Sequence, residues 1–140
     1  MGAFSAEKIR FQIIGMSAAL LQGVPMTTFD VDLWLDLPSR QYMRAINLAR
    51  SLGAAMVRST VVELPDRTLV NFIYEVTGLK TFAAEFKKAR MLLFHGIRVP
   101  VMPLALIQRN KEAMRRPKDI VHLQAIKEML RVRRQSRTSK

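Results

Sequence analysis

Cysteine is absent from the 140-residue sequence. Its absence excludes disulfide scaffolds, thiolate zinc sites and cysteine nucleophiles together, and it is consistent with a reducing cytoplasm. Long apolar runs are also missing, because the stretch 11–24 is interrupted by glutamine, glycine and serine and is too short for a bilayer of about 30 Å. With Glu7 close to Met1, the first residues do not have the pattern of a signal peptide. We therefore expect no membrane association and a cytoplasmic location.

Acidic residues are few, with 11 Asp and Glu against 23 Lys and Arg, which gives a net charge of +12. A surface this basic attracts polyanions such as nucleic acid, a nucleoside triphosphate or an acidic partner, although a merely solvated cationic surface is an equal alternative. Part of the excess is concentrated at residues 131–140, which hold five cations and no acid. The sequence predicts one domain over residues 1–130, followed by a basic, disordered tail over residues 131–140.

Three common functional motifs are missing as well. The sequence has no GxxxxGK(S/T) loop, no GxSxG elbow and no aromatic pair of the RNA-recognition type. Their absence argues against P-loop kinases, serine hydrolases and RNA-recognition domains. His95 and His122 lack a Cys, His or acid at zinc-like spacing, so we interpret them as surface or helix-packing histidines.

The hydrophobic content of 49% is sufficient for a packed core, and the periodicity of the apolar residues changes along the chain. It predicts strands over 11–14, 29–35, 61–64, 69–76, 91–94 and 99–102, and helices over 16–21, 39–52, 81–88, 103–114 and 117–130. Ser39 is the expected N-cap of the second helix. The expected fold class is α/β (α+β), with a short mixed β-sheet flanked by helices and a C-terminal helical pair.

The pair Asp30 and Asp32 is the main candidate for chemistry. Residues 29–35 alternate strictly, so both carboxylates project from one face of the strand, about 7 Å apart at the backbone. Two neighbouring carboxylates repel each other and favour a bound cation, and hard oxygen ligands prefer Mg²⁺ or Mn²⁺. By itself an Asp-x-Asp pair is weak evidence, since most such pairs only face solvent. Trp34 lies on the same face, either as a base-stacking residue or as a cover for the sheet.

The surrounding sequence strengthens the metal-site hypothesis. Residues 11–35, FQIIGMSAALLQGVPMTTFDVDLWL, have the pattern of a strand, a glycine turn, a helix, a loop and a strand with two acids. This segment resembles the polymerase-β-like nucleotidyltransferase superfamily, and most closely its small branch related to AbiEii-type toxins, through the runs 23–25 and 28–33. A second segment, LALIQRNKEAMRRPKDIVHL, is similar to the late helical motif of that family, which here comprises Lys111, Arg115, Lys118 and Asp119. The resemblance covers nearly the whole chain.

The resemblance implies an activity and a set of site residues. The activity is transfer of a nucleoside monophosphate from an NTP to a hydroxyl of an RNA, protein or small-molecule acceptor, with Mg²⁺ or Mn²⁺ as cofactor. Asp30 and Asp32 are the implied metal ligands and, together with Lys111, the implied catalytic residues. The implied nucleotide-binding residues are Gly15, Ser17, Thr28, Lys111, Arg115 and Asp119, with Asp119 ordering either the lysine or the helix junction. Helical spacing places Lys111 and Arg115 on one face.

Two positions depart from the family pattern. Met16 stands where the family usually has Gly or Ser, which makes Ser17 the candidate for the missing hydroxyl. Asn71 stands where a third carboxylate is expected, and an amide is not a general base and is a poorer metal ligand than a carboxylate. Glu63 and Glu75 are either substitutes for that acid or ordinary surface residues. The alternative function is therefore a catalytically impaired module that binds nucleotide, nucleic acid or a partner protein, as in a toxin–antitoxin pair.

Overall fold

Two strands from the first quarter of the chain form the centre of a β-sheet. The computed structural model describes residues 9–25, 30–94 and 96–138. In it β1 (Phe11–Ile14) is buried along its whole length, and β2 (Asp30–Leu35) pairs with it in antiparallel register, with Ile14 opposite Asp32. Because side chains alternate along a strand, the two aspartates of β2 share one face, and the buried Leu33 faces the other way.

The sheet mixes parallel and antiparallel pairs, as the sequence predicts. Beyond β2 lie β5 (Leu69–Ile73), which is parallel to it, and then the antiparallel strands β4 (Val61–Glu63) and β3 (Ala55–Arg58). Beyond β1 lie β7 (Ile97–Val101), parallel to β1, and the antiparallel strand β6 (Arg90–Phe94). The described residues thus form a seven-stranded sheet of order β3-β4-β5-β2-β1-β7-β6.

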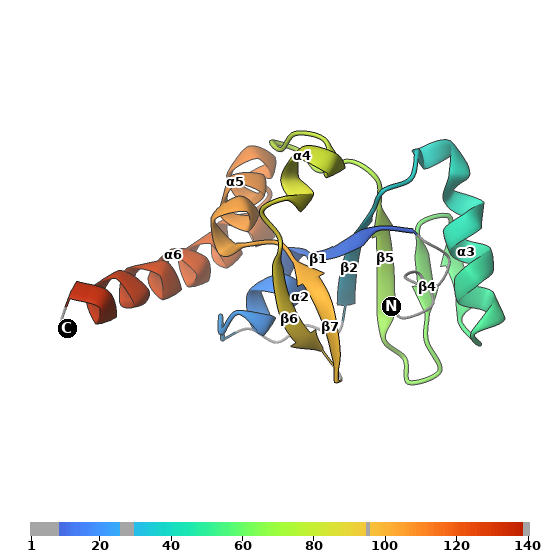
Figure 1. Ribbon diagram of the computed structural model, residues 1–140, viewed down its shortest axis with the longest axis horizontal. Coiled ribbons are helices and arrows are strands. Elements are labelled where there is room, and N and C mark those ends of the chain that lie inside the picture. Colours follow the sequence, from blue (N-terminus) through green and yellow to red (C-terminus); the bar gives the residue numbers. More distant parts are fainter. Residues whose placement is uncertain (1–8, 26–29, 95, 139–140) are drawn as a thin grey trace.

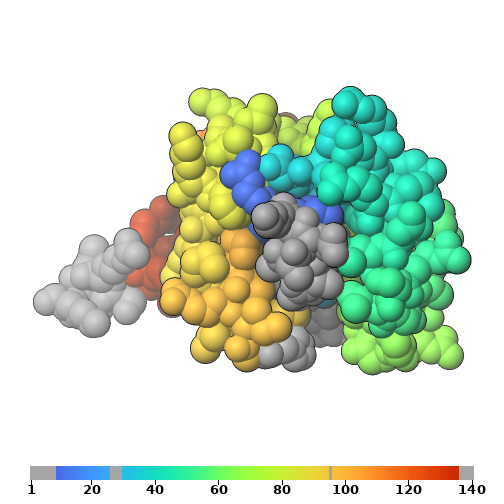
Figure 2. Space-filling model, turned by 45° about the vertical axis from the view of Figure 1, so that its right-hand side comes forward, coloured from blue at the N-terminus to red at the C-terminus, as the bar shows by residue number. Residues whose placement is uncertain are grey.

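Helices lie at both ends of this sheet, and α2 (Gly15–Leu21) lies beside the central strands β1 and β2 (Figure 1). The described residues also form η1 (Ser39–Gln41, a 3-10 turn), α3 (Tyr42–Ser51), α4 (Phe82–Phe86), α5 (Leu104–Met114) and α6 (Pro117–Thr138). Figure 1 shows α3 at one end and α5 and α6 at the other, with β1 and β2 between them. Figure 2 shows the C-terminal helix extending past the β6–β7 hairpin. None of the helices found in the described ranges is long and apolar enough to cross a membrane.

The structure corrects two expected element boundaries. Ser39 begins η1 rather than capping an α-helix, and α3 starts three residues later at Tyr42 without a side-chain cap, because the first turn tightens into 3-10 geometry. The last helix does not end near Leu130 but continues to Thr138. It is held beyond that point by Arg133, which donates a hydrogen bond to the carbonyl oxygen of Gln22.

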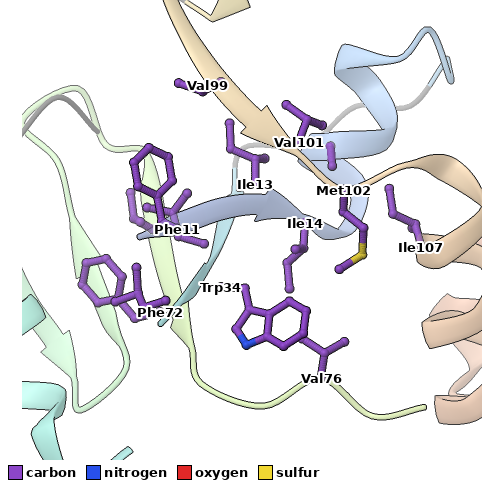
Figure 3. Packing of buried hydrophobic residues seen from close by; sticks show 14 of the residues in the cluster. Phe11, Ile13, Ile14, Trp34, Phe72, Val76, Val99, Val101, Met102 and Ile107 are labelled. Carbon is purple, nitrogen blue, oxygen red and sulfur yellow. The ribbon is translucent and has the colours of Figure 1, made fainter. Parts of the chain in front are cut away.

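Trp34 belongs to the core and does not face a ligand. It is 1% exposed, its Nε1 donates to the carbonyl oxygen of Tyr74 at 3.2 Å, and its ring meets that of Phe82 edge-on with centroids 5.4 Å apart. Figure 3 shows it between Ile14 and Val76 in the buried cluster. Of the two roles left open by the sequence, the structure supports the cover for the sheet.

Candidate functional site

A cleft of about 720 Å³ opens on the sheet face that carries the two aspartates. Its floor consists of β2 and β5, one wall of the β1–α2 turn together with α5 and α6, and the other wall of the β3–β4 hairpin. Among the residues singled out in the sequence, those that line this cleft include Gly15, Asp30, Asp32, Asn71 and Lys111. The cleft therefore joins the two segments that carry the family resemblance, although Asp32 and Lys111 are 79 positions apart in the sequence.

Gly15 forms a tight contact between the β1–α2 turn and the carboxylate of Asp32. Its φ is +65°, in the left-handed region that side chains rarely adopt. A Cβ at this position would lie only 2.3 Å from Oδ2 of Asp32. Glycine is therefore required here for two separate reasons, one of backbone conformation and one of space.

The hydroxyl of Ser17 is used inside the protein. It donates to the carbonyl oxygen of Ile14 at 2.9 Å and accepts from the backbone N–H of Asp32 at 3.3 Å. Ser17 is buried and does not line the cleft, whereas the neighbouring Met16 does line it. The serine thus fastens the turn to β2, which aligns Asp32. Thr28, the other hydroxyl residue expected at the nucleotide, lies outside the described residues.

Asn71 lies directly beside Asp32. The two residues are register partners in the parallel β2–β5 pair, and Nδ2 of Asn71 donates to Oδ1 of Asp32 at 2.7 Å. Burial raises the pKa of the Asp32 carboxyl above its ordinary value, and the hydrogen bond from Asn71 and the charge of Lys111 only partly offset this effect. The repulsion of Asp30 acts in the same direction as burial. An ionised Asp32 is therefore under electrostatic stress that a cation in the cleft would relieve.

The corner between α5 and α6 holds a buried cluster of charges. The carboxylate of Asp119 is fully buried and accepts from Nζ of Lys111 at 3.2 Å and from Nε and the backbone N–H of Arg116 at 2.7 and 3.0 Å. Burial alone would raise the pKa of Asp119, but the hydrogen bonds from Arg116 and Lys111 outweigh it and hold this pKa well below its ordinary value. The cluster fixes Lys111 at the cleft wall, where its side chain is only 8% exposed.

Arg115 is not part of the cleft lining, whereas Lys111 is. The residue has a φ of 53° and ends α5 in the left-handed conformation. Its Nε donates to the carbonyl oxygen of Glu112 at 3.0 Å, and the side chain is exposed outside the cleft lining. Its backbone N–H still donates to the carbonyl oxygen of Lys111 at 3.0 Å, so the residue caps the C-terminus of α5.

Several residues of the cleft have no signal in the sequence. Arg58 and Thr60 come from the β3–β4 hairpin and belong to no motif. Lys118, which belongs to the late helical motif, and His122, which was expected at the surface or in helix packing, come from α6 and also line the cleft. Burial lowers the pKa of His122, and Nδ1 of this ring is buried without a partner among the described residues. Of the two glutamates considered as substitutes for a third acid, Glu75 lines the cleft and Glu63 does not. His95 lies outside the described residues.

Comparisons with known proteins place this arrangement in a known fold. No protein-family model matches the sequence, and no curated protein does either. Among solved structures, the antibiotic-resistance factor ANT(2'')-Ia matches with a TM-score of 0.59 and 18% identity over 99% of this chain and 88% of that one. The lincosamide adenylyltransferase LnuA, bound to lincomycin, matches with a TM-score of 0.54 and 9% identity over 89% of each chain. TM1012 of Thermotoga maritima, assigned as a nucleotidyltransferase, matches with a TM-score of 0.55 and 16% identity over 98% of this chain and 88% of that one. The chain has the nucleotidyltransferase fold.

The nucleotidyltransferase fold agrees with the fold class predicted from the sequence, including the mixed sheet and the C-terminal helical pair. The more specific resemblance to the AbiEii-related branch stays a prediction. The same is true of the roles of the site residues, because the three solved structures are too distant in sequence to transfer them.

Gly15→Ala is expected to destabilise this nucleotidyltransferase fold by about 1–3 kcal/mol, through strain at positive φ and through displacement of the Asp32 carboxylate. Urea denaturation measures the change in the free energy of unfolding. Gly96→Ala is the matched control, since Gly96 also has a positive φ of 78° but a Cβ there would meet nothing within 4 Å. Equal losses in the two variants would show that the contact with Asp32 contributes nothing.

Proposed function

We propose that the chain transfers a nucleoside monophosphate from an NTP to a hydroxyl of an acceptor. The observation that carries the proposal is the position of Asp32. Its carboxylate is partly buried, contacts the Gly15 turn, and lies on the cleft floor beside Asp30 and near the positive charges of Lys111 and Lys118. Two acids surrounded by cations form a site for a divalent ion together with the phosphates of a nucleotide.

The donor set fits Mg²⁺ or Mn²⁺ held jointly with a nucleotide. Asp30 and Asp32 offer carboxylate oxygens from one strand face, and no group of three His, Cys, Asp or Glu residues able to hold a metal occurs in the described part of the chain. Mg²⁺ is commonly bound by one or two carboxylates plus substrate phosphates rather than by an all-protein cage. When bound, such an ion would neutralise the negative charge that develops on the phosphates.

The protein's own residues would position the reactants. Lys111, fixed by Asp119, and Lys118 would bind the phosphates that leave, and the Gly15 turn would hold Asp32 in place. In the reaction the acceptor oxygen bonds to the α-phosphorus and the bond between that phosphorus and the oxygen bridging to the β-phosphate breaks. Pyrophosphate departs with the electron pair, and the hydroxyl proton passes to water in the open cleft. This is positioning and charge stabilisation, without a covalent enzyme intermediate.

The alternative function rests on Asn71. In this position an amide donates a hydrogen bond to Asp32 and cannot accept the proton of an attacking hydroxyl. A module that binds nucleotide, nucleic acid or a partner protein without turnover would keep this cleft unchanged. Incubation with each radiolabelled NTP, Mg²⁺ or Mn²⁺, and total cellular RNA, protein or metabolites separates the two functions, because only the enzyme transfers label.

The proposed site predicts that metal and nucleotide bind cooperatively. We expect Mn²⁺ to bind the free protein weakly, and at least about tenfold more tightly when a non-cleavable α,β-methylene NTP analogue is present, since the analogue supplies the missing ligands. Calorimetric titration measures both affinities. Asp30→Asn is expected to remove the coupling.

Glu63→Gln serves as the control, because this carboxylate lies outside the cleft lining and its loss should leave the coupling intact. Tight binding of Mn²⁺ in the absence of nucleotide, or failure of the analogue to bind at all, would contradict the proposed function.

A further inference from the structure

The cleft has positive side chains on two walls that face each other across the aspartates. Lys111 and Lys118 belong to the α5–α6 wall, on the side of β1, and Arg58 belongs to the β3–β4 wall, beyond β5. β2, which carries Asp30 and Asp32, runs between them. Figure 1 shows the same separation, with α5 and α6 on one side of β2 and β4 and β5 on the other. A nucleoside triphosphate accounts for one positive wall and leaves the second without a ligand.

The triphosphate fits the α5–α6 wall better. The positive charges that stabilise ionised Asp32 are those of Lys111 and Lys118, and the Gly15 turn, which contacts the same carboxylate, lies on their side of the strand. In phosphoryl transfer the attacking and leaving oxygens are roughly in line. If pyrophosphate leaves towards the two lysines, the attacking hydroxyl comes from the direction of β5, β4 and β3.

Arg58 is available on that approach. Its side chain is exposed, and its guanidinium makes no hydrogen bond or ion pair with any residue that the structure describes. By contrast, Arg10 is paired with Asp36 and Arg116 with Asp119. The β3–β4 register shifts between Met56 and Arg58, and such bulges commonly redirect a side chain beside an active site.

We propose that the acceptor carries a phosphate group close to the hydroxyl that is modified, and that Arg58 binds this phosphate. The inference rests on the proposed nucleotidyl transfer and names the class of its second substrate. A guanidinium forms paired hydrogen bonds with phosphate oxygens, which orients a ligand as well as attracting it. The transfer itself is unchanged: the acceptor oxygen bonds to the α-phosphorus, pyrophosphate leaves with the electron pair, and the proton goes to water.

The opposite class of acceptor is a cationic amine. Glu75, an exposed carboxylate of the cleft lining, is the group that would favour it. Glu75 lies beyond the end of β5. Arg58, by contrast, lies on the far side of β5 and β4 from Asp32, which is the direction from which the attacking hydroxyl comes. The net charge of +12 adds a general repulsion against a polycationic ligand. The observations therefore favour the phosphate.

The test compares acceptors with and without a phosphate group, together with one cationic amine. The full-length chain is given Mg²⁺, an α-labelled NTP and one of these probes: ribose or ribose 5-phosphate, glycerol or glycerol 3-phosphate, a nucleoside or a short oligoribonucleotide with a free 3'-hydroxyl, and glucosamine. Sugar phosphates and the oligonucleotide distinguish a metabolite from a nucleic-acid source of the phosphate. Binding of each probe is also titrated in the presence of Mg²⁺ and the α,β-methylene analogue, so that the result does not depend on turnover.

We expect the phosphate-bearing member of at least one pair to be preferred about tenfold or more over its neutral partner. Arg58→Gln should reduce this preference to about twofold or less, Arg58→Lys should retain part of it, and the affinity for the NTP analogue should stay the same in both variants. Arg50→Gln, on an exposed position of α3 outside the cleft lining, is the control with the same change in charge.

Two kinds of failure are distinguishable. If the NTP analogue does not bind, the proposed function itself is wrong. If the analogue binds but no phosphate-bearing probe binds or is labelled, or if neutral sugars or glucosamine are used equally well, the proposed acceptor class is wrong and the nucleotide site stands. A preference that survives Arg58→Gln assigns the phosphate to another side chain and overturns the role of Arg58.

Discussion

Asp32→Asn is expected to abolish nucleotidyl transfer and, at the same time, to make the folded protein more stable. Loss of the carboxylate removes a metal ligand at the reacting phosphate, which lowers the transfer rate by roughly 10²–10³-fold or more. The gain in stability follows from burial, which raises the pKa of Asp32 in the folded state above its ordinary value of 3.8. The penalty for keeping this group ionised is absent below that value and grows as the pH rises above it. The gain should therefore be largest near neutral pH and disappear in acid.

Label transfer from NTP measures the first effect, and urea denaturation at pH 7 and below pH 4 measures the second. Asp36→Asn is the control, because Asp36 directly follows β2 but is exposed and paired with Arg10 outside the main cleft. Its activity should stay unchanged. If Asp32→Asn lost stability together with activity, the loss of transfer would report a damaged fold and not a missing ligand. The opposite signs of the two effects make the result specific to a functional residue that is held at the expense of stability.

Those parts of the fold that depend on patterns of neighbouring residues could be predicted well from the sequence. The strict alternation around Asp30 and Asp32 fixes β2 and the face that both carboxylates share, and Pro103 and Pro117 mark the beginnings of α5 and α6. β3 was missed because all four of its residues are exposed and carry no apolar alternation. It exists only because β4 offers a partner for its backbone, and that information is not local.

The site could be predicted only where two segments each carry a motif. Asp32 and Lys111 belong to such segments, and the structure brings both to one cleft. Arg58 has no motif around it, and the strand order alone places it opposite the lysines. Ser17 shows a different limit of prediction from the sequence. A hydroxyl next to the β1–α2 turn can face outwards to a ligand or inwards to the backbone, and the sequence does not distinguish the two. Here it faces inwards, towards Ile14 and Asp32.

The amide at Asn71 has a physical consequence that the sequence comparison alone does not reveal. A carboxylate beside Asp32 would add to the repulsion that Asp30 already exerts, whereas the amide donates a hydrogen bond to the ionised form. An amide in place of a carboxylate thus removes one negative charge from the site, and its hydrogen bond favours the ionised form of Asp32 before any ion binds. This is consistent with binding a single metal ion that depends on the nucleotide for further ligands.

Asp119→Ala is expected to lower the free energy of unfolding by about 3–5 kcal/mol, because it leaves the buried ammonium of Lys111 without its partner. The contribution of Asp119 to the free energy of unfolding changes with pH in the opposite direction to that of Asp32. The pKa of Asp119 lies well below its ordinary value of 3.8, since the hydrogen bonds from Arg116 and Lys111 outweigh burial. Its contribution is therefore fully present above that value and decreases as the pH falls below it. The difference in stability between the native chain and the variant, measured by urea denaturation, should be constant from neutral pH down to about pH 5 and shrink below pH 4.

The chain contains its own control for this experiment. Glu128 pairs with Arg131 at the same sequence spacing that joins Asp119 to Arg116, but the second pair is exposed at both ends. Glu128→Ala should therefore cause no measurable loss of stability, because an exposed ion pair is screened by water.

Lys111→Met provides the reciprocal test, since Asp119 would keep its hydrogen bonds to Arg116 and the loss of stability should be smaller than in Asp119→Ala. Equal losses in the two reciprocal variants would mean that Arg116 contributes little and that the lysine is the main partner of the buried carboxylate. Nucleotide affinity adds an independent readout: both variants should weaken binding of the NTP analogue, whereas Glu128→Ala should not, if the cluster serves to hold Lys111 at the cleft wall.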